Sequence, residues 1–366
     1  MITRRSALSL LAAPALAQTP ALLYRSTVFS YPNTDPYDGA NRNGFNHAPN
    51  ICTLPDGRLL AVWFSGPFEA SVNQMILGAF SDDGGHSWSR PEVRNDFPRK
   101  SDFDPSLVVD GARTHLLFIA GRWNRYPFVH GEKNFTGKES YWIYHRASDD
   151  SGRTWSPPRA VLSEPAFCTR GNGIRHSSGC LLVPIYQMQG DHACVLKSTD
   201  GGNSWKRTGH VTCRAGIEEP TIAELGAGAV LMALRTRDGR LWHSTSTDRG
   251  ETWAESVRTS IPAARASHSL FRTKSGRLVL THDECPPPNR TPLTLRVSND
   301  DAATWSEPLT IAQVPIPKPG DAVWSRQATY PSVTELRDGT LGVVWSDISI
   351  ADESQAGDIR FARVRI

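Results

Sequence analysis

The chain has 366 residues, with 40 Lys and Arg against 37 Asp and Glu, so its formal net charge is +3. A charge so near zero gives no indication of the basic surface that nucleic-acid or membrane-surface binding requires. The length exceeds the roughly 250–300 residues at which one ordinary hydrophobic core stops growing. A repeat fold has no such limit, because each unit packs only on its neighbours.

Residues 1–17 predict an export signal. Arg4 and Arg5 give a charged start, residues 7–13 form an apolar middle, and residues 15–17 are a small-residue end typical of a cleavage site. The paired arginines followed by Leu8 suit a twin-arginine signal, with a Sec signal as the alternative. The apolar run is far shorter than the roughly 20 residues that cross a bilayer. We therefore expect cleavage and a periplasmic or extracellular location.

A strand–turn–strand pattern recurs along the remaining chain. Its first copy, residues 54–63, is a short strand, a turn that contains glycine, and a second apolar strand. The intervals between successive turn glycines run from 48 residues (228 to 276) to 68 residues (111 to 179), the size of a four-stranded blade with its loops. The six turn glycines are Gly57, Gly111, Gly179, Gly228, Gly276 and Gly339. Six units predict six blades.

An eight-residue motif, Ser-x-Asp-x-Gly-x-(Ser/Thr)-Trp, falls between those turns five times. Its Asp carboxylate can accept hydrogen bonds from the turn's own N–H groups, Gly supplies a positive φ, and Trp covers the loop with apolar area. We therefore predict that these aspartates are structural and not catalytic. The fifth copy has Ala302 in place of Gly, which predicts either strain of about 1–3 kcal/mol or another turn shape. The copies are Ser81–Trp88, Ser148–Trp155, Ser198–Trp205, Ser246–Trp253 and Ser298–Trp305.

The last unit has no copy of this motif. Its terminal strand, residues 359–366, is apolar at alternate positions with one slip. We expect this strand to lie beside an N-terminal strand near residues 21–29, which would close the ring and hide the edges. The strands are too short and too often interrupted by Gly, Pro and Asn to be helices. The sequence therefore predicts an all-β chain in which residues 18–366 form one six-bladed β-propeller.

No metal or cofactor is predicted. The six cysteines are spaced as in no zinc or redox motif, and we expect buried free thiols. His268 and residues 282–284 add polar groups to the fifth unit without the ligand spacing of a zinc or calcium site. The cysteines are Cys52, Cys168, Cys180, Cys194, Cys213 and Cys285.

The five Asp-boxes, together with residues 171–175 leading to residues 181–184, resemble the sialidase (neuraminidase) superfamily over nearly the whole mature chain. Asp-boxes also occur in propellers that only bind, and in hydrolases and lyases of other sugars. The functional argument therefore depends on individual positions. The resemblance implies a six-bladed propeller, no cofactor, and a glycan partner with a terminal acidic sugar.

Three segments resemble functional segments of that family. Residues 328–342 resemble the segment with the nucleophilic tyrosine, which implies that Tyr330 is the nucleophile. Residues 218–235 resemble the segment that carries the glutamate partner and one arginine of the carboxylate-binding triad. Glu219 and Arg235 take these roles, with the neighbouring Glu218 as a rival for the first. Arg290, ahead of the last Asp-box, resembles the second arginine of the triad.

Chemistry explains why such residues occur together. A sialic acid carries a carboxylate on its anomeric carbon, which would repel a carboxylate nucleophile, whereas a tyrosine avoids this repulsion. A phenol with a pKa near 10 needs a base to take its proton, and Glu219 would be that base. Arginines bind the substrate carboxylate because their planar fork makes two charge-assisted hydrogen bonds.

The sequence departs from the family at the first arginine of the triad. Members open with an aromatic-Arg-Ile-Pro motif, and the aligned residues here are 46–49, which places His47 at the arginine. A histidine is mostly neutral at pH 7 and offers one donor in place of a fork. Affinity for a carboxylate should therefore fall by about 1–3 kcal/mol. Arg42 and Arg326 are the arginines that could compensate for His47 as a substrate-binding residue.

A second departure concerns the acid/base aspartate. The family places it between that motif and the first Asp-box, but residues 66–75 contain no aspartate and only one carboxylate, Glu69. Glu69 is our first candidate for the proton donor, and Asp102 and Asp104 are the others. Residues 121–128, rich in aromatic and polar side chains, form either a wall of the pocket or a plain surface loop.

Three functions follow from these matches and departures. The leading hypothesis is an exported exo-glycoside hydrolase of the sialidase type that releases a terminal acidic sugar with retention through Tyr330. One alternative is a hydrolase or lyase of another acidic or deoxy sugar that uses His47 as acid or base. The other is a propeller that binds glycans without turnover.

Overall fold

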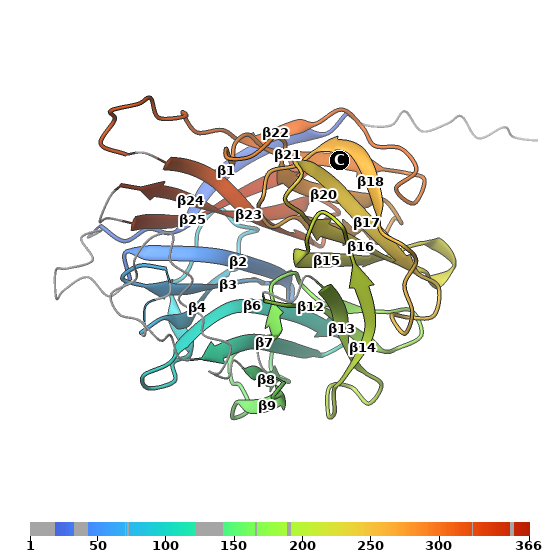
Figure 1. Ribbon diagram of the computed structural model, residues 1–366. Coiled ribbons are helices and arrows are strands. Elements are labelled where there is room, and N and C mark those ends of the chain that lie inside the picture. Colours follow the sequence, from blue (N-terminus) through green and yellow to red (C-terminus); the bar gives the residue numbers. More distant parts are fainter. Residues whose placement is uncertain are drawn as a thin grey trace, which may run out of the picture.

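The computed structural model describes residues 19–32, 43–69, 71, 73–121, 142–164, 167–188, 192–323, 325–351 and 355–366. The predicted export signal, Arg42 and residues 122–128 of the aromatic loop lie outside these ranges. Figure 1 shows six antiparallel sheets arranged around a common centre, as the repeats predict. Within the described ranges the only helical element is the short 3-10 turn η1 (Gly226–Gly228). That part of the chain therefore offers no helix that could span a membrane.

Five blades follow the chain in order. Blade one consists of β2 (Phe45–Thr53), β3 (Leu59–Gly66), β4 (Met75–Ser81) and β5 (Glu92–Asn95). Blade two consists of β6 (Ser101–Asp110), β7 (Arg113–Gly121), β8 (Trp142–Ser148) and β9 (Arg159–Leu162). Blade three consists of β10 (Phe167–Thr169), β11 (Ile174–Arg175), β12 (Leu181–Gln187), β13 (His192–Ser198) and β14 (Lys206–Thr212). Blade four consists of β15 (Glu218–Glu224), β16 (Val230–Arg235), β17 (Arg240–Ser246) and β18 (Val257–Pro262). Blade five consists of β19 (Ser269–Arg272), β20 (Leu278–Asp283), β21 (Leu293–Ser298) and β22 (Leu309–Ala312).

Blade six joins the two ends of the chain. Its strands run β23 (Ser325–Glu335), β24 (Leu341–Ile350), β25 (Gln355–Arg365) and β1 (Ala21–Phe29) from the centre outward. β1, drawn in blue among the red strands of Figure 1, pairs antiparallel with β25 from Ala21 opposite Arg365 to Phe29 opposite Ile359. The expected ring closure is confirmed. It also explains the missing sixth Asp-box, because the third and fourth strands of this blade are not consecutive and no loop joins them.

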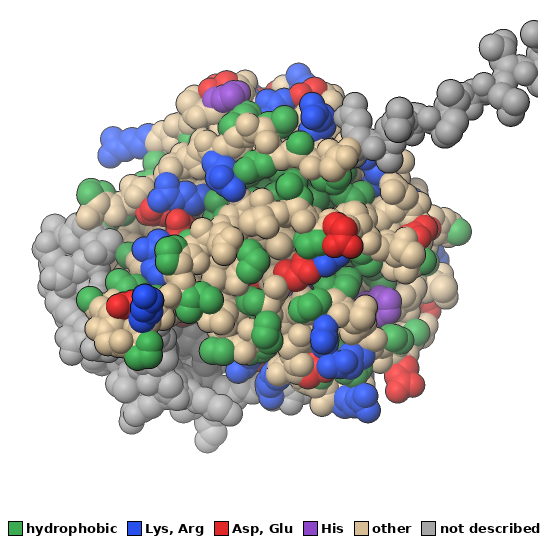
Figure 2. All heavy atoms as spheres, turned by 90° about the horizontal axis from the view of Figure 1, so that it is seen from above, with side chains coloured by type: hydrophobic (Ala, Val, Ile, Leu, Met, Phe, Trp, Pro, Cys, Tyr) green, Lys and Arg blue, Asp and Glu red, His purple; other side chains and the backbone are tan. Residues whose placement is uncertain are grey.

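The hydrophobic core lies between neighbouring blades. One buried cluster joins Val108 and Leu117 of blade two to Leu181 and Val183 of blade three. Another joins blades four and five, and a third joins blade six to blade one. Each sheet therefore buries both faces against its neighbours, as a repeat fold requires. The face shown in Figure 2 carries Lys, Arg, Asp and Glu side chains interspersed, with no large area of one sign.

The six cysteines, all within the described residues, are free thiols, and all but Cys213 are buried. Burial raises the pKa of Cys52 and of Cys194 to about 12, so these thiols stay protonated at neutral pH. They pack as small apolar side chains.

Each Asp-box forms the turn between the third and fourth strands of its blade. In the second box, Thr154 N donates to Asp150 Oδ1 over 2.9 Å and Thr154 Oγ1 donates to Asp150 Oδ2 over 2.6 Å. In the third box, the hydrogen bonds from Ser204 lower the pKa of Asp200 to about 2. These carboxylates accept their hydrogen bonds from their own turn, as expected if the motif is structural.

The glycine of each box also faces the preceding blade. A Cβ at Gly85 would overlap the Phe361 ring of blade six, and a Cβ at Gly202 would overlap the His115 ring of blade two. Ala302 of the fifth box keeps the same shape, with a φ of 72° and its N–H bonded to Ser298 Oγ over 2.9 Å. Of the two expected outcomes for this turn, the structure therefore shows the strained one.

Two neighbouring glycines test this packing. Gly201 and Gly202 both have positive φ, but a Cβ at Gly201 meets nothing within 4 Å. Gly201→Ala should lower the free energy of unfolding by about 1 kcal/mol through backbone strain alone. Gly202→Ala should lower it by about 2–4 kcal/mol, because overpacking against His115 adds to the strain. Urea unfolding measures both, and equal losses would contradict the inter-blade contact.

Candidate active site

A repeated bulge shapes the inner strands. In β2, β6, β15 and β23 the pairing slips by one step, and at each slip a residue with positive φ precedes a proline. A residue before proline normally adopts an extended conformation, so these four positions are strained. Strain of this kind concentrates at functional sites. The four residues are Ala48 (φ 53°), Asp104 (φ 48°), Glu219 (φ 38°) and Tyr330 (φ 58°).

Blade three places an arginine at the corresponding position. Arg170 lies nine residues before Gly179, as Glu219 lies nine before Gly228 and Tyr330 nine before Gly339. The inner strand of this blade is interrupted between β10 and β11, and Arg170 follows directly on β10. The nine-residue spacing from the turn glycine, which Asp104 of blade two does not share, is the signal that could have found Arg170 from the sequence.

Tyr330, Glu219 and Arg235 form one hydrogen-bonded group. Tyr330 Oη donates to Glu219 Oε1 over 2.7 Å, and Arg235 Nη1 donates to Tyr330 Oη over 2.7 Å. Arg235 also forms a close ion pair with Glu219 Oε2. Burial raises the pKa of Tyr330, although Arg235 lowers it, so the phenol is protonated at rest. The structure thus brings the predicted nucleophile and the predicted base into contact across blades six and four.

Glu218 is not positioned to act on Tyr330. It receives an ion pair from Arg235 Nε at 3.0 Å and another from Arg265 Nη2 at 2.7 Å. Although burial acts the other way, these arginines hold the pKa of Glu218 at about 2. Glu218 therefore orients Arg235 from behind, and the rival assignment for the base loses its geometric support.

His47 packs against the tyrosine. The centres of the His47 and Tyr330 rings are 4.1 Å apart, and His47 Nδ1 lies 2.9 Å from Ser346 Oγ. Burial, and then Arg170 and the other nearby arginines, hold the pKa of His47 well below its usual value. His47 is therefore neutral at pH 7. It can share a hydrogen bond with a ligand but supplies no positive charge.

Arg290, predicted as the second arginine of the triad, lies near the tyrosine. Its guanidinium carbon is 5.7 Å from the centre of the Tyr330 ring, and its Nη1 donates to Gln327 Oε1 over 3.3 Å. Arg326, by contrast, forms an ion pair with Asp347 at 3.5 Å. This contact gives no support to the prediction that Arg326 compensates for His47. Below the site, Thr329 Oγ1 donates to the buried Asp283 over 2.5 Å.

The three candidate acids have different surroundings. Asp102 is buried beside a turn, where it accepts hydrogen bonds from Asn95 Nδ2 (2.7 Å) and Phe97 N (3.0 Å). Its carboxylate therefore stabilises this turn. Glu69 is exposed, and its backbone N–H donates to Gln355 Oε1 over 2.8 Å. Its charge acts on both Tyr330 and Asp104. Glu69 and Asp104 therefore remain the two candidate acids.

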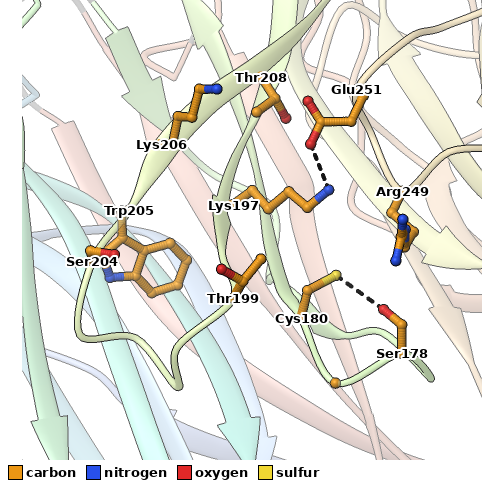
Figure 3. Close-up of a pocket in the computed structure, with 11 residues that line it drawn as sticks. Ser178, Cys180, Lys197, Thr199, Ser204, Trp205, Lys206, Thr208, Arg249 and Glu251 are labelled. Atoms are coloured by element: carbon orange, nitrogen blue, oxygen red, sulfur yellow. Dashed lines mark hydrogen bonds and ion pairs between the residues drawn. The ribbon is translucent and has the colours of Figure 1, made fainter.

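A separate hollow of about 710 Å³ lies between blades three and four (Figure 3). Its lining includes Lys197, whose ammonium is 2.7 Å from Glu251, together with Trp205 and Arg249. The hollow adjoins the Asp-box turns, and in blade four that turn begins at Ser246, which pairs with Val230 at the start of β16. Glu218 pairs with Arg235 at the other end of β16, so the hollow and the Tyr330 site lie at opposite ends of this strand. This hollow contains none of the groups around Tyr330. Among the described residues, no group of three or more His, Cys, Asp or Glu is arranged for a metal ion.

Comparisons with known proteins concern the family and the fold of the chain. Residues 57–343 match the BNR repeat-like domain family. The chain belongs to this family. Its fold is that of the sialidase superfamily, as the Asp-boxes predicted. A leech protein described as an anhydrosialidase (Macrobdella decora) is 32% identical over 123 residues, which cover 31% of this chain and 16% of that protein.

Solved structures support the fold over nearly the whole chain. The sialidase NanB of Streptococcus pneumoniae superposes with a TM-score of 0.74 at 17% identity, covering 93% of this chain and 70% of that one. A Dyadobacter fermentans protein of unknown function superposes with a TM-score of 0.73 at 16% identity, covering 95% and 99%. At such identities the likeness concerns the fold alone.

The surroundings of Asp104 predict a pH effect on stability. Burial, with Glu219 adding to it, raises the pKa of Asp104 to about 8. Between about pH 4 and pH 8 the folded chain therefore keeps a proton that the unfolded chain has lost, so the free energy of unfolding falls as the pH rises. Asp104→Asn should remove this part of the slope. The melting temperature of the variant relative to wild type should rise between about pH 4.5 and about pH 8.

The exposed Asp82 provides the matched control, because Asp82→Asn removes a carboxylate outside the core. A difference between Asp104→Asn and wild type that stays constant across this pH range would show that Asp104 is ionised in the folded protein.

Proposed function

We propose that this protein is an exo-acting glycoside hydrolase of the sialidase type, releasing a terminal sialic acid or a related acidic sugar with retention. The hydrogen-bonded group of Tyr330, Glu219 and Arg235 carries the proposal, because it places a phenol against a base beside a cation. The partial match to the leech anhydrosialidase, with the family match, supports this substrate class. The export signal expected in residues 1–17 suits a substrate outside the cytoplasm.

In the first step, Glu219 accepts the phenolic proton as Tyr330 Oη forms a bond to the anomeric carbon. The bond from that carbon to the leaving oxygen breaks, and this oxygen takes a proton from the acid of the site. Arg235 and Arg290 lie where they can bind the sugar carboxylate, while neutral His47 adds a single hydrogen bond. Tyrosine suits this step because it is uncharged before it reacts.

In the second step, the acid, now a carboxylate, takes a proton from water as the water oxygen attacks the anomeric carbon. The bond to Tyr330 Oη breaks, and the tyrosine regains its proton from Glu219. Two inversions give net retention. We assign the acid role to Glu69 first, because an exposed carboxylate at the rim can reach both the leaving group and water. Asp104 is the alternative from within the pocket.

Hydrolysis of 4-methylumbelliferyl sialoside tests the nucleophile. The wild type should release the fluorophore, and Tyr330→Phe should lower kcat by at least about 10³-fold, because no covalent intermediate can form. Melting curves should show that the variant is folded. The product should appear first as the anomer of the substrate, which NMR of a fresh reaction detects. A fully active Tyr330→Phe variant would overturn the assignment.

His47→Ala distinguishes the remaining functions. Under the proposal it should mainly raise KM, because His47 contributes one hydrogen bond to binding. An inactive His47→Ala variant beside an active Tyr330→Phe variant would instead support the alternative in which His47 is the acid or base. Glycan binding without product on any acidic sugar would favour a binding propeller.

Leaving-group dependence separates the two acids. An umbelliferyl group departs with little protonation, whereas a sugar needs a full proton from the acid. The variant that lacks the acid should therefore lose about 10²-fold or more on a sialoside with a sugar leaving group and much less on the umbelliferyl substrate. We expect this pattern for Glu69→Gln. The same pattern for Asp104→Asn alone would move the role to Asp104.

A further inference from the structure

Arg170 is a buried cation beneath the candidate nucleophile. It is 1% exposed, although arginine is seldom buried so completely. Its guanidinium carbon lies 5.0 Å from the centre of the Tyr330 ring, closer than those of Arg235 (5.9 Å) and Arg290 (5.7 Å). A guanidinium at this distance from an aromatic ring is attracted to it.

The same side chain connects three blades. Arg170 Nη2 donates to the backbone oxygen of Tyr330 over 3.2 Å in blade six, and Nη1 donates to that of Pro49 over 3.3 Å in blade one. Asn50 Nδ2 returns a hydrogen bond to the backbone oxygen of Arg170 over 2.8 Å. Both carbonyls belong to the bulges, so Arg170 holds the strained backbone that presents the tyrosine.

The charge of Arg170 has effects beyond these contacts. Burial lowers its pKa, while Asp104, Glu219 and Tyr330 act in the opposite direction, so it interacts with the acidic groups of the site. After burial, Arg170 is the largest cause of the lowered pKa of His47. Arg170 Nε has no hydrogen-bond partner among the described residues. A neutral side chain would join the blades at a lower desolvation cost, so the retained charge points to a role in the chemistry.

We propose that Arg170 is a positioning residue that fixes Tyr330 and stabilises negative charge on its phenolic oxygen while the proton is on Glu219. This inference rests on the proposed function. As Oη loses its proton to Glu219, the phenol gains electron density that a cation beneath the ring attracts. When the bond from the anomeric carbon to Oη breaks in the second step, the electron pair of that bond goes to the phenolic oxygen, which again gains negative charge. Arg170 thus favours both steps without touching the substrate.

Steady-state kinetics test this role. Arg170→Met removes the charge but keeps much of the length, and it should lower kcat by about 10²-fold, the range for losing one preorganised electrostatic group. KM should stay within about threefold, because Arg170 does not bind the sugar. Arg170→Lys keeps the charge and should retain more activity than Arg170→Met. Guanidinium ion added to Arg170→Ala should restore part of kcat.

Arg94→Met is the matched control. Arg94 is 4% exposed and pairs with Glu92 at 3.1 Å in the outer strand of blade one, away from Tyr330. Its loss should lower the melting temperature without changing kcat. If Arg170→Met lowers only the melting temperature, Arg170 is a structural strut. If KM rises and kcat does not change, Arg170 binds substrate. Either result would overturn the proposal.

An NMR titration of His47 gives a readout that needs no turnover. Its imidazole signals can be assigned by comparison with His47→Gln. The pKa of His47 should rise in Arg170→Met and stay unchanged in Arg94→Met, because Arg170 lowers the pKa of His47 and Arg94 is not among the arginines that do so. An unchanged pKa in Arg170→Met would overturn the proposal. A wild type that hydrolyses no acidic glycoside would refute the proposed function, and the titration would still test the charge.

Discussion

One backbone constraint determines the centre of this molecule. Four inner strands carry a residue with positive φ directly before a proline, and three of these residues are Asp104, Glu219 and Tyr330. The bulge turns the side chain out of the strand's normal alternation, and the proline prevents the strand from returning to regular pairing. Because neighbouring blades pack tightly on both faces, the strain is held in place. Asp104, Glu219 and Tyr330 are therefore placed by the strands themselves, whereas Glu69 lies in the connection between β3 and β4.

The positively charged side chains at this centre differ in what they contact. Arg235 contacts both Tyr330 and Glu219, while Arg170 lies beneath the ring. Burial and the nearby arginines keep His47 uncharged, so this residue, which aligns with an arginine of the family, contributes shape and a hydrogen bond instead of charge. A substrate carboxylate would therefore find positive charge at Arg235 and Arg290 and none at His47. Such asymmetry favours one orientation of a sugar ring.

Much of the fold could be predicted from the sequence, because each turn glycine and each Asp-box is a local signal with a local cause. Ring closure by β1 and β25 followed from the edge strands that an open ring would expose. The contact between Tyr330 and Glu219 depended on resemblance, since no local pattern relates residues 111 positions apart. Arg170 was missed because Gly171 follows it where blades one, two, four and six have proline, so only its spacing from the turn glycine marked the position in the sequence.

Ring closure also has a consequence for the order of synthesis. β1 is the first strand of the structure to leave the ribosome, and its partner β25 is the last. Until β25 has been synthesised, β1 lacks its partner and the circle of blades is incomplete. Tyr330 cannot be held between blades five and one before that moment. The surroundings of Tyr330 are therefore complete only when strands from both ends of the propeller have come together.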